Sequence, residues 1–332
     1  MKALIIGGGA IAEQHCQALT KLGVEVYAIC DLNIKAAQTL AEQYRAKAFG
    51  DVSLALAEQV DFVSVCTPSG THPALAIQAM EAGKHVVVEK PLALCVEDCK
   101  SVIETEKKTG KICAPISQLR FSETYKSVKR IIEAGELGTL VTGSLSMHYY
   151  RAPEYYAGSW KGTKALDGGE LFNQGIHGLD VMCGLLGKPT QVSGSVVTRL
   201  HQIETEDTAV ASMIYPGGMM GTLESSTAVF YSTPRRMEIC GTKGSITMIE
   251  DTISVAEGVS LELSPQKKFI TNDPKLESSE EHERIYKNIL AAFLGKEKLQ
   301  YTTKDAANTV HLICAIYESS ETKQVITLKE EL

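Results

Sequence analysis

The sequence predicts two domains: an α/β domain with a doubly wound parallel sheet, then an α+β domain with a mostly antiparallel, open sheet. In the first 120 residues, short apolar runs alternate with helical patterns, which is typical of consecutive βαβ units. After about residue 121, apolar runs follow one another over glycine-rich turns, which indicates antiparallel strands. A chain of 332 residues is long enough for two hydrophobic cores. We therefore expect one domain over residues 1–120 and a second over residues 121–332.

The parallel sheet is expected from apolar runs that are separated by segments with helical periodicity. The predicted strands are Lys2–Ile6, Val24–Cys30, Asp61–Cys66, His85–Val88 and Lys111–Ala114. The predicted helices between them are Ile11–Lys21, Ile34–Tyr44, Pro73–Glu81 and Val96–Thr109.

The second domain is expected to begin with helices and to continue as strands joined by turns. The predicted helices are Thr124–Glu133, Gly178–Leu186, about His282–Phe293 and about Ala306–Ser319. The predicted strands are Gln191–Thr198, Thr208–Tyr215, Met220–Ser226, Arg236–Cys240 and Ser245–Ile249. Because helices are scarce after residue 190, we expect one face of this sheet to be covered by self-association.

Composition and charge exclude several classes of function. The 33 Lys and Arg residues against 40 Asp and Glu residues leave a net charge of −7, which argues against nucleic acid or a membrane surface as the main partner. The nine cysteines are scattered and form no C-x-x-C pair, so we expect neither a disulfide framework nor a metal site. Met1 leads directly into an apolar strand, without the pattern of a secretory signal, so we expect a cytoplasmic location.

A glycine-rich turn follows the first predicted strand and opens the first predicted helix. Gly7-Gly8-Gly9-Ala10-Ile11-Ala12 fits the pattern G-x-G-x-x-A, in which the glycines let the backbone approach a pyrophosphate. Asp31 ends the second strand, 19 residues after Ala12, where an acid binds the ribose hydroxyls of a dinucleotide. The alternatives are a turn without ligand and a helix-capping aspartate. Since Asp31 repels a 2′-phosphate and no arginine lies in residues 31–34, the sequence predicts a Rossmann domain that binds NAD rather than NADP.

Two further motifs follow later strands and are expected at the same crevice, because ligands bind beyond the carboxyl ends of parallel strands. They are Thr67–His72 and Glu89-Lys90-Pro91. His72 is alternatively a helix-start residue beside Pro73. The full set of expected cofactor contacts is Gly7, Gly8, Gly9, Ala10, Ile11, Asp31, Thr67, Pro68, His72, Glu89 and Lys90.

At this point the sequence resembles the Gfo/Idh/MocA family of sugar and inositol oxidoreductases over essentially its whole length. The matching motifs are the glycine turn, T-P-S-G-T-H at Thr67–His72, E-K-P at Glu89–Pro91, Arg120-Phe121, Gly135–Gly138, Gly168–Asp180, Asp207-Thr208 and Gly241–Gly244. The stretch from Trp160 to His177 is similar to the branch that includes nucleotide-sugar 3-dehydrogenases. The resemblance implies a homodimer or homotetramer built on the antiparallel sheet.

This chain departs from the family pattern at two positions. Glu170 stands where the family often has a third glycine, and Asn173 stands where it commonly has an acid. By resemblance, Lys90 is the lysine that hydrogen-bonds the reacting oxygen. The amide of Asn173 cannot accept a proton, so it cannot replace that acid in acid–base catalysis. The acid–base role is therefore expected of His177, of Lys90 or of both. Asp180 either orients the imidazole of His177 or faces solvent.

Aromatic rings beside hydrogen-bond donors suit sugar rings, and basic groups suit a carboxylate or diphosphate. The expected substrate contacts are Lys90, Asn173 and His177 with Arg120, Tyr149, Tyr150, Arg151, Trp160, Lys161 and His282. For each residue of the second group, a purely structural role is the alternative.

The sequence therefore predicts an NAD-dependent dehydrogenase that transfers a hydride between nicotinamide and a secondary alcohol or ketone. The expected substrate is a sugar, an amino sugar, a sugar acid or a cyclitol, and a sugar substrate could carry a linked nucleotide. Two other functions fit the same motifs: an NAD-dependent glycosidase that oxidises the sugar transiently, and a non-catalytic NAD-binding regulator.

Overall fold

The computed structural model describes residues 1–260 and 274–328, with side chains from residue 280 onward in the helix that begins at Pro274. The chain forms two compact units. Unit 1 contains Met1–Ala93, Glu97–Gln118 and the described part of Ile270–Ala307. Unit 2 contains Leu94–Val96 and the described parts of Leu119–Phe269 and Asn308–Leu332. The first boundary lies close to the expected residue 120, whereas we had expected Ile270–Ala307 in the second domain.

Unit 1 is built on a parallel sheet of six strands. These are β1 (Lys2–Ile6), β2 (Glu25–Cys30), β3 (Lys47–Phe49), β4 (Phe62–Val65), β5 (His85–Val88) and β6 (Cys113–Pro115). Their order is β3-β2-β1-β4-β5-β6, so the chain reverses its direction of winding between β1 and β4. The predicted doubly wound sheet is therefore confirmed, and ligands in such sheets bind at this switch point.

Helices cover this sheet as the apolar periodicity predicts. They are α1 (Ala10–Lys21), α2 (Ile34–Tyr44), α3 (Val52–Leu56), α4 (His72–Glu81), α5 (Val96–Thr109) and α8 (Pro274–Phe293). Helix α3 and strand β3 were not predicted, because they are too short to show a periodic pattern. Nor was it predicted that α8 packs against α1, an arrangement that brings Tyr286 onto His15.

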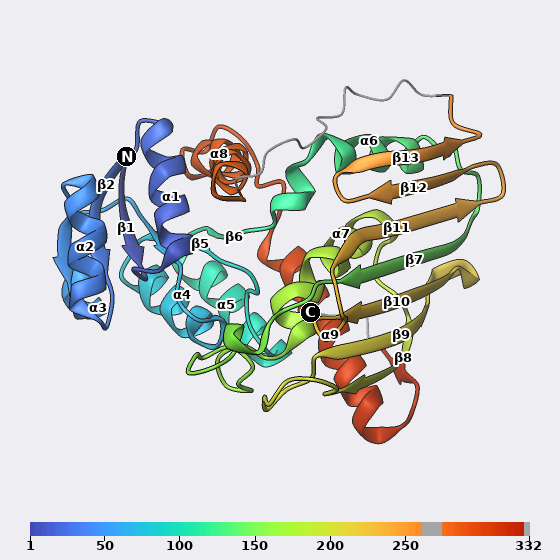
Figure 1. The fold of residues 1–332 in the computed structure, drawn as a ribbon. Coiled ribbons are helices and arrows are strands. Elements are labelled where there is room, and N and C mark those ends of the chain that lie inside the picture. The colour runs from blue at the N-terminus through green and yellow to red at the C-terminus, as the bar shows by residue number, and fades with distance from the viewer. Residues whose placement is uncertain (261–273, 329–332) are drawn as a thin grey trace. The chain divides into compact units, whose positions relative to one another are not determined.

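Unit 2 is built on a sheet of eight strands in the order β13-β12-β11-β7-β10-β9-β8-β14 (Figure 1). The strands are β7 (Leu140–His148), β8 (Gln191–Val197), β9 (Thr208–Ile214), β10 (Met220–Ser226), β11 (Thr233–Gly241), β12 (Ser245–Ile249), β13 (Thr252–Glu257) and β14 (Ile326–Thr327). All neighbours are antiparallel except β7 and β10, which are parallel. The mostly antiparallel sheet is confirmed. The sequence analysis missed β7 because its Thr, Gly and Ser residues hide the alternation of a strand.

Three helices belong largely to unit 2: α6 (Glu123–Glu133), α7 (Ile176–Leu186) and the part of α9 (Thr303–Thr322) from Asn308 onward. Helix α7 packs closely on β7, because a Cβ atom at Gly178 would lie 2.3 Å from the sulfur of Met147. The opposite face of the sheet carries the exposed side chains of Val210, Ile214 and Met220 among serines, threonines and charged residues such as Glu224. Within the described residues, no helix combines the length and apolarity needed to cross a membrane.

Candidate active site

The glycine turn in unit 1 has the shape of a pyrophosphate cradle. Gly7 has φ +113°, and a Cβ atom there would lie 2.5 Å from the carbonyl oxygen of Cys66, so only glycine fits. A Cβ atom at Gly9 would meet no described atom within 4 Å, so packing does not explain that glycine, whereas approach of a pyrophosphate does. Gly9 also caps α1 without any side-chain hydrogen bond, which leaves the first N–H groups of the helix for an anion.

Asp31 holds this turn from the end of β2. Its Oδ2 atom accepts a hydrogen bond from the N–H of Gly8 at 2.7 Å, and its Oδ1 atom accepts one from the N–H of Asn33 at 2.7 Å. Each carboxylate oxygen has a further lone pair, and the side chain is part-exposed. The residues therefore fit a dinucleotide, with phosphates at the start of α1 and a ribose at Asp31.

His72 ties the loops after β4 and β5 to each other. Its Nδ1 atom lies 2.7 Å from the carbonyl oxygen of Pro91, and its Nε2 atom lies 2.8 Å from that of Thr67. The hydroxyl of Thr67 lies 2.7 Å from that of Thr71. Burial lowers the pKa of His72, which is only 1% exposed and is the first residue of α4. The side chain of His72 thus shapes both loops, as the helix-start interpretation implies.

Glu89 lies at the centre of a buried network next to Lys90. Its Oε1 atom accepts hydrogen bonds from Nε2 of His15 at 2.9 Å and from Nε2 of His282 at 3.1 Å. Its Oε2 atom accepts the backbone N–H of Lys90 at 3.0 Å. Burial raises the pKa of Glu89, but the hydrogen bonds from the two histidines outweigh it and hold the pKa well below its usual range. A charged carboxylate therefore fixes the backbone at Lys90.

The histidines of this network are oriented by their other neighbours. The Nδ1 atom of His15 lies 2.7 Å from the hydroxyl of Tyr286 and 2.8 Å from that of Ser64. Burial lowers the pKa of His15, so a neutral ring that donates from Nε2 and accepts at Nδ1 satisfies every contact. His15, Glu89 and His282 also place their possible ligand atoms within 4.8 Å of one another. The hydrogen bonds account for this spacing without an ion. His282 is fully buried, so the packed interpretation describes it better than a substrate contact.

In unit 2, Asn173 lies on a π-helical turn, Leu171–Gly175, directly before α7. Such turns often occur at functional sites. The Nδ2 atom of Asn173 donates to Asp167, and its Oδ1 atom accepts from Nε2 of Gln174 at 2.7 Å and from the hydroxyl of Tyr155 at 3.4 Å. The amide is therefore held in one orientation. His177 is the second residue of α7 and is half-buried.

Of the two alternatives for Asp180, the solvent-facing one is wrong, because the residue is only 3% exposed. Its two carboxylate oxygens accept from Nε and Nη2 of Arg120, both at 2.9 Å, and one also accepts from the hydroxyl of Thr309. Arg120, expected as a substrate contact, is thus part of an internal bidentate ion pair. Arg120 and Asp180 are 60 positions apart in the sequence, so no local sequence pattern could predict this ion pair.

A second group of buried acids lies beside the π-helical turn. Glu170 accepts from the hydroxyl of Ser225 at 2.7 Å, while Glu206 accepts from the hydroxyl of Tyr317 at 2.8 Å and from the N–H of Leu171 at 2.9 Å. Burial raises the pKa of Glu170 to about 8 and that of Glu206 to about 7. Both side chains are therefore largely neutral below these values. The sequence analysis noticed Glu170 only as a departure from the family pattern and missed Glu206.

The other expected substrate contacts of unit 2 lie in or near the loop after β7. Trp160 and Lys161 are half-buried, and the ammonium of Lys161 lies 3.7 Å from the ring centre of Tyr155. Arg151 donates to the side-chain oxygen of Gln174 at 3.0 Å. Arg151, Tyr155 and Lys161 thus form one cluster with Asn173. Burial raises the pKa of Tyr149, with a partly offsetting effect of Arg235.

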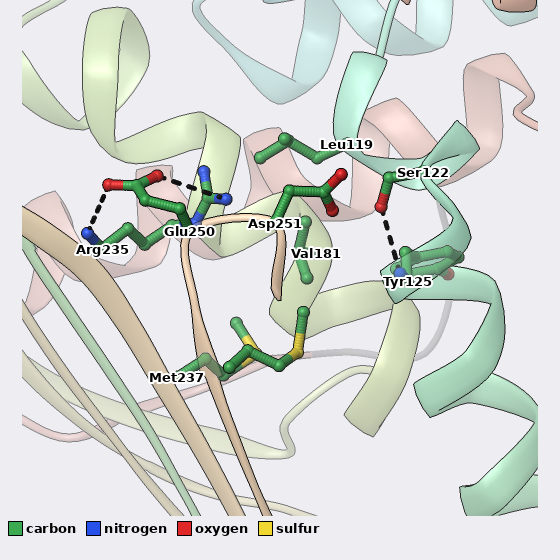
Figure 2. Close-up of a pocket in the computed structure, with 9 residues that line it drawn as sticks. Leu119, Ser122, Tyr125, Val181, Arg235, Met237, Glu250 and Asp251 are labelled. Carbon is green, nitrogen blue, oxygen red and sulfur yellow. Dashed lines mark hydrogen bonds and ion pairs between the residues drawn. The ribbon is translucent and has the colours of Figure 1, made fainter. Parts of the chain in front are cut away.

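One cavity in unit 2 is distinct from these residues. It lies between α6, α7 and strands β11 and β12, beside the ion pair of Arg235 and Glu250 and the capping bond of Ser122 (Figure 2). It offers about 10 Å³, which is room for a single water molecule. This cavity is too small for a sugar and contains none of the predicted site residues.

The fold, the phosphate-binding turn and Asp31 define the chain as an NAD-binding oxidoreductase. Its residues 1–116 match the model of an oxidoreductase family with an NAD-binding Rossmann fold, and residues 125–247 match the GFO/IDH/MocA C-terminal domain. The chain belongs to the Gfo/Idh/MocA family, and it is an NAD-dependent dehydrogenase acting on CH–OH groups.

Several relatives of known identity are similar to this chain. D-glucoside 3-dehydrogenase of Escherichia coli is 27% identical, over 97% of this chain and 96% of its own. The scyllo-inositol 2-dehydrogenase (NAD(+)) of Bacillus subtilis is 32% identical, over 62% of this chain and 61% of its own. The WlbA dehydrogenase of Bordetella pertussis, solved with NADH and UDP-GlcNAcA, has a TM-score of 0.90 and 27% identity, with 100% of this chain and 99% of that chain covered.

Proposed function

We propose that this enzyme transfers a hydride between NAD and a secondary hydroxyl or keto group of a sugar, sugar acid, nucleotide-linked sugar or cyclitol. The observation that carries the proposal is the carboxylate of Glu89, which holds the backbone of Lys90 at the end of β5. The names of the relatives, which act on a glucoside or an inositol or bind a nucleotide-linked sugar acid, support the same substrate class.

NAD, when bound, supplies the hydride acceptor or donor. Gly7–Gly9 and the start of α1 would hold its pyrophosphate, and Asp31 would hold its ribose; the remaining expected contacts, Ala10, Ile11, Thr67 and Pro68, line the same strand ends. Lys90 would donate a hydrogen bond to the reacting oxygen and stabilise its developing negative charge.

His177 would take the hydroxyl proton during oxidation and return it during reduction. An imidazole titrates near neutral pH, whereas the amide of Asn173 cannot accept a proton. Asn173, held by Asp167 and Gln174, would instead donate to or accept from a hydroxyl group of the substrate.

The test is incubation with NAD and a panel of sugars, sugar acids, nucleotide-linked sugars and inositols. NADH formation with retention of the glycosidic bond supports the proposal. Release of an aglycone would identify a glycosidase, and saturable NAD binding without turnover of any compound would identify a regulator.

We further propose that the exposed face of the unit 2 sheet forms a homodimer or homotetramer. The face carries Val210, Ile214 and Met220 among small polar and charged residues, a composition suited to a partly polar interface. Light scattering that finds only monomers at micromolar concentration would contradict it. The cytoplasmic location stays a prediction.

A further inference from the structure

Two cations of unit 2 lie against the same aromatic ring. The ammonium of Lys161 is 3.7 Å from the ring centre of Tyr155, and the guanidinium carbon of Arg151 is 5.3 Å from it. Both cations are only half-buried, so a solute can approach them. Two like charges beside one ring repel each other, and that repulsion falls when an anion lies between or beside them.

Neither cation has a carboxylate partner among the described residues. The other part-buried arginines of unit 2 differ in this respect: Arg120 is paired with Asp180 at 2.9 Å, and Arg235 is paired with Glu250 at 3.6 Å. Arg151 donates only to the neutral amide of Gln174, and its Nε atom is buried without a hydrogen-bond partner in the structure. Arg151 as a whole is half-buried, and the accessible part of its guanidinium is a ready donor for a carboxylate or phosphate oxygen.

The position of Arg151 is set by its own backbone. Its N–H donates to the carbonyl oxygen of Thr227 at 3.0 Å, and its carbonyl oxygen lies 2.8 Å from Nε2 of His201. The ring of Tyr155 is fixed in turn by an edge contact with Tyr156 and by a hydrogen bond to Asn173. The backbone of Arg151 and the ring of Tyr155 are thus held in place, which lowers the cost of ordering the two cations around a ligand.

We propose that Arg151 and Lys161 form a subsite for an anionic group of the substrate, either a sugar carboxylate or a phosphate linked to the sugar. This inference rests on the proposed function, because Tyr155, whose ring lies beside both cations, also donates a hydrogen bond to Asn173, the proposed substrate contact. The protein as a whole carries a net charge of −7, so anion binding here depends on this local pair. The subsite selects acidic or phosphorylated sugars over their neutral counterparts.

The binding test uses the only tryptophan of the chain, Trp160, which precedes Lys161, as a fluorescence reporter. Titration of the NADH-loaded protein compares D-glucuronate, D-galacturonate and D-mannuronate with their neutral hexoses and with D-glucuronamide. Glucose 1-phosphate and UDP-glucose distinguish a phosphate from a carboxylate. We expect at least one anionic probe to bind about tenfold to a hundredfold more tightly than its neutral counterpart, the scale of a charge-assisted hydrogen bond. Equal binding of neutral and anionic probes, or no binding of any anionic probe, would overturn the proposal.

Substitutions of the two cations test whether the preference for anionic probes comes from Arg151 and Lys161. Arg151→Gln and Lys161→Gln should each reduce the preference for the anionic probe by about tenfold. Lys161→Gln keeps the test decisive if Arg151→Gln does not fold, because among the described residues the Lys161 ammonium makes no hydrogen bond or ion pair and lies only against the Tyr155 ring. The control Arg236→Gln removes a cation from the exposed side of β11 and should leave the preference unchanged. A preference that survives both site variants would place the anion elsewhere.

Binding and turnover separate this inference from the proposed function. If anionic probes bind through Arg151 and Lys161 but no sugar is oxidised, the subsite stands and the proposed oxidoreductase function fails. If only neutral sugars or inositols are oxidised and anions do not bind, the function stands and the subsite fails.

Discussion

Glu89 in unit 1 and Glu170 in unit 2 are buried to nearly the same depth, at 4% and 3% exposure, yet their charge states differ. Glu89 receives N–H groups from His15, His282 and the backbone of Lys90. Glu170 receives one hydroxyl, from Ser225, and its Oε2 atom has no hydrogen-bond partner in the structure. The pKa of Glu89 is accordingly held well below its usual range, while burial raises that of Glu170 to about 8. The number of donors around a buried carboxyl group, and not its depth, decides whether it is charged.

Each unit therefore has its own charge state of buried acids near its proposed site residues. Unit 1 keeps a fixed negative charge next to Lys90, which suits a residue that must present a cation to a developing oxyanion. In unit 2, Glu170 and Glu206 lie beside the π-helical turn that carries Asn173 and are largely neutral below their pKa values of about 8 and about 7, and the proposed base of this unit is His177. The predictions below test each half of this comparison.

The largest effect is expected when each half loses its proposed catalytic residue. His177→Ala should lower turnover by about 10²–10⁴-fold, the usual scale of general acid–base catalysis, with unchanged NAD affinity. Lys90→Ala should also slow turnover, through loss of positive charge at the reacting oxygen. Steady-state kinetics and NAD titration measure both. His148→Ala, a β7 histidine paired with Glu224, is the matched control and should leave turnover unchanged. Near-normal turnover in His177→Ala would make Lys90 the base.

Neutralising the charged acid should have the next largest effect. In Glu89→Gln, the amide oxygen still accepts from both histidines, but the amide nitrogen faces the N–H of Lys90, so that hydrogen bond is lost. We expect turnover to fall about tenfold to a hundredfold at unchanged NAD affinity. Glu42→Gln, on the exposed side of α2, serves as control.

The same variant tests the sign of the Glu89 pKa shift. A depressed native pKa stabilises the fold above the unfolded value of 4.5, and this contribution is lost as the pH falls through the native pKa. Glu89→Gln should therefore show a shallower loss of unfolding free energy in acid than the wild type. Acid denaturation followed by circular dichroism measures it, and an identical acid limb would refute the charged state of Glu89.

Asp31 is a second carboxylate of unit 1 that accepts backbone N–H groups, and it tests whether charge selects the cofactor. We expect NAD to bind at least about tenfold more tightly than NADP, because Asp31 repels the 2′-phosphate. Asp31→Ser should narrow this ratio. Titration of both cofactors measures it, with Asp98→Ser on α5 as an exposed control. Equal affinity of the wild type for both cofactors would contradict the role of Asp31.

Replacing the neutral acid Glu170 of unit 2 should change the free energy of unfolding rather than turnover. A raised native pKa means that the contribution of Glu170 is present below 4.5 and is lost as the pH rises toward 8. Glu170→Gln cannot ionise, so it should be more stable than the wild type by about 1–3 kcal/mol at about pH 9, and should differ less at about pH 5. Urea denaturation at both pH values measures this. Glu318→Gln, at an exposed position of α9, is the control. Equal destabilisation at both pH values would show that Glu170 is charged in the fold.

The cofactor half of the site could be predicted from the sequence because its signals are local. Gly7–Gly9, the helix that follows and Asp31 at the end of β2 lie within one βαβ unit, where glycine spacing and apolar periodicity determine the backbone. The E-K-P motif and His177 were likewise recognised from short patterns, although their catalytic roles stay predictions. The parallel direction of the strands in unit 1 followed from the same alternation, whereas their order was seen only in the structure.

Only the tertiary structure decided which distant residues meet. His15 and His282 bind Glu89 although they lie 74 and 193 positions from it in the sequence. Helix α8 belongs to unit 1 although most of unit 2 precedes it in the sequence. Asp180 pairs with Arg120 and does not face solvent. A periodic pattern identifies the face that an element buries, but it does not identify the partner that covers this face. The charge of a buried acid depends on those partners through desolvation and hydrogen bonding. The ionised state of Glu89 and the neutral state of Glu170 were therefore decided by packing, whereas the cofactor turn was determined by the sequence itself.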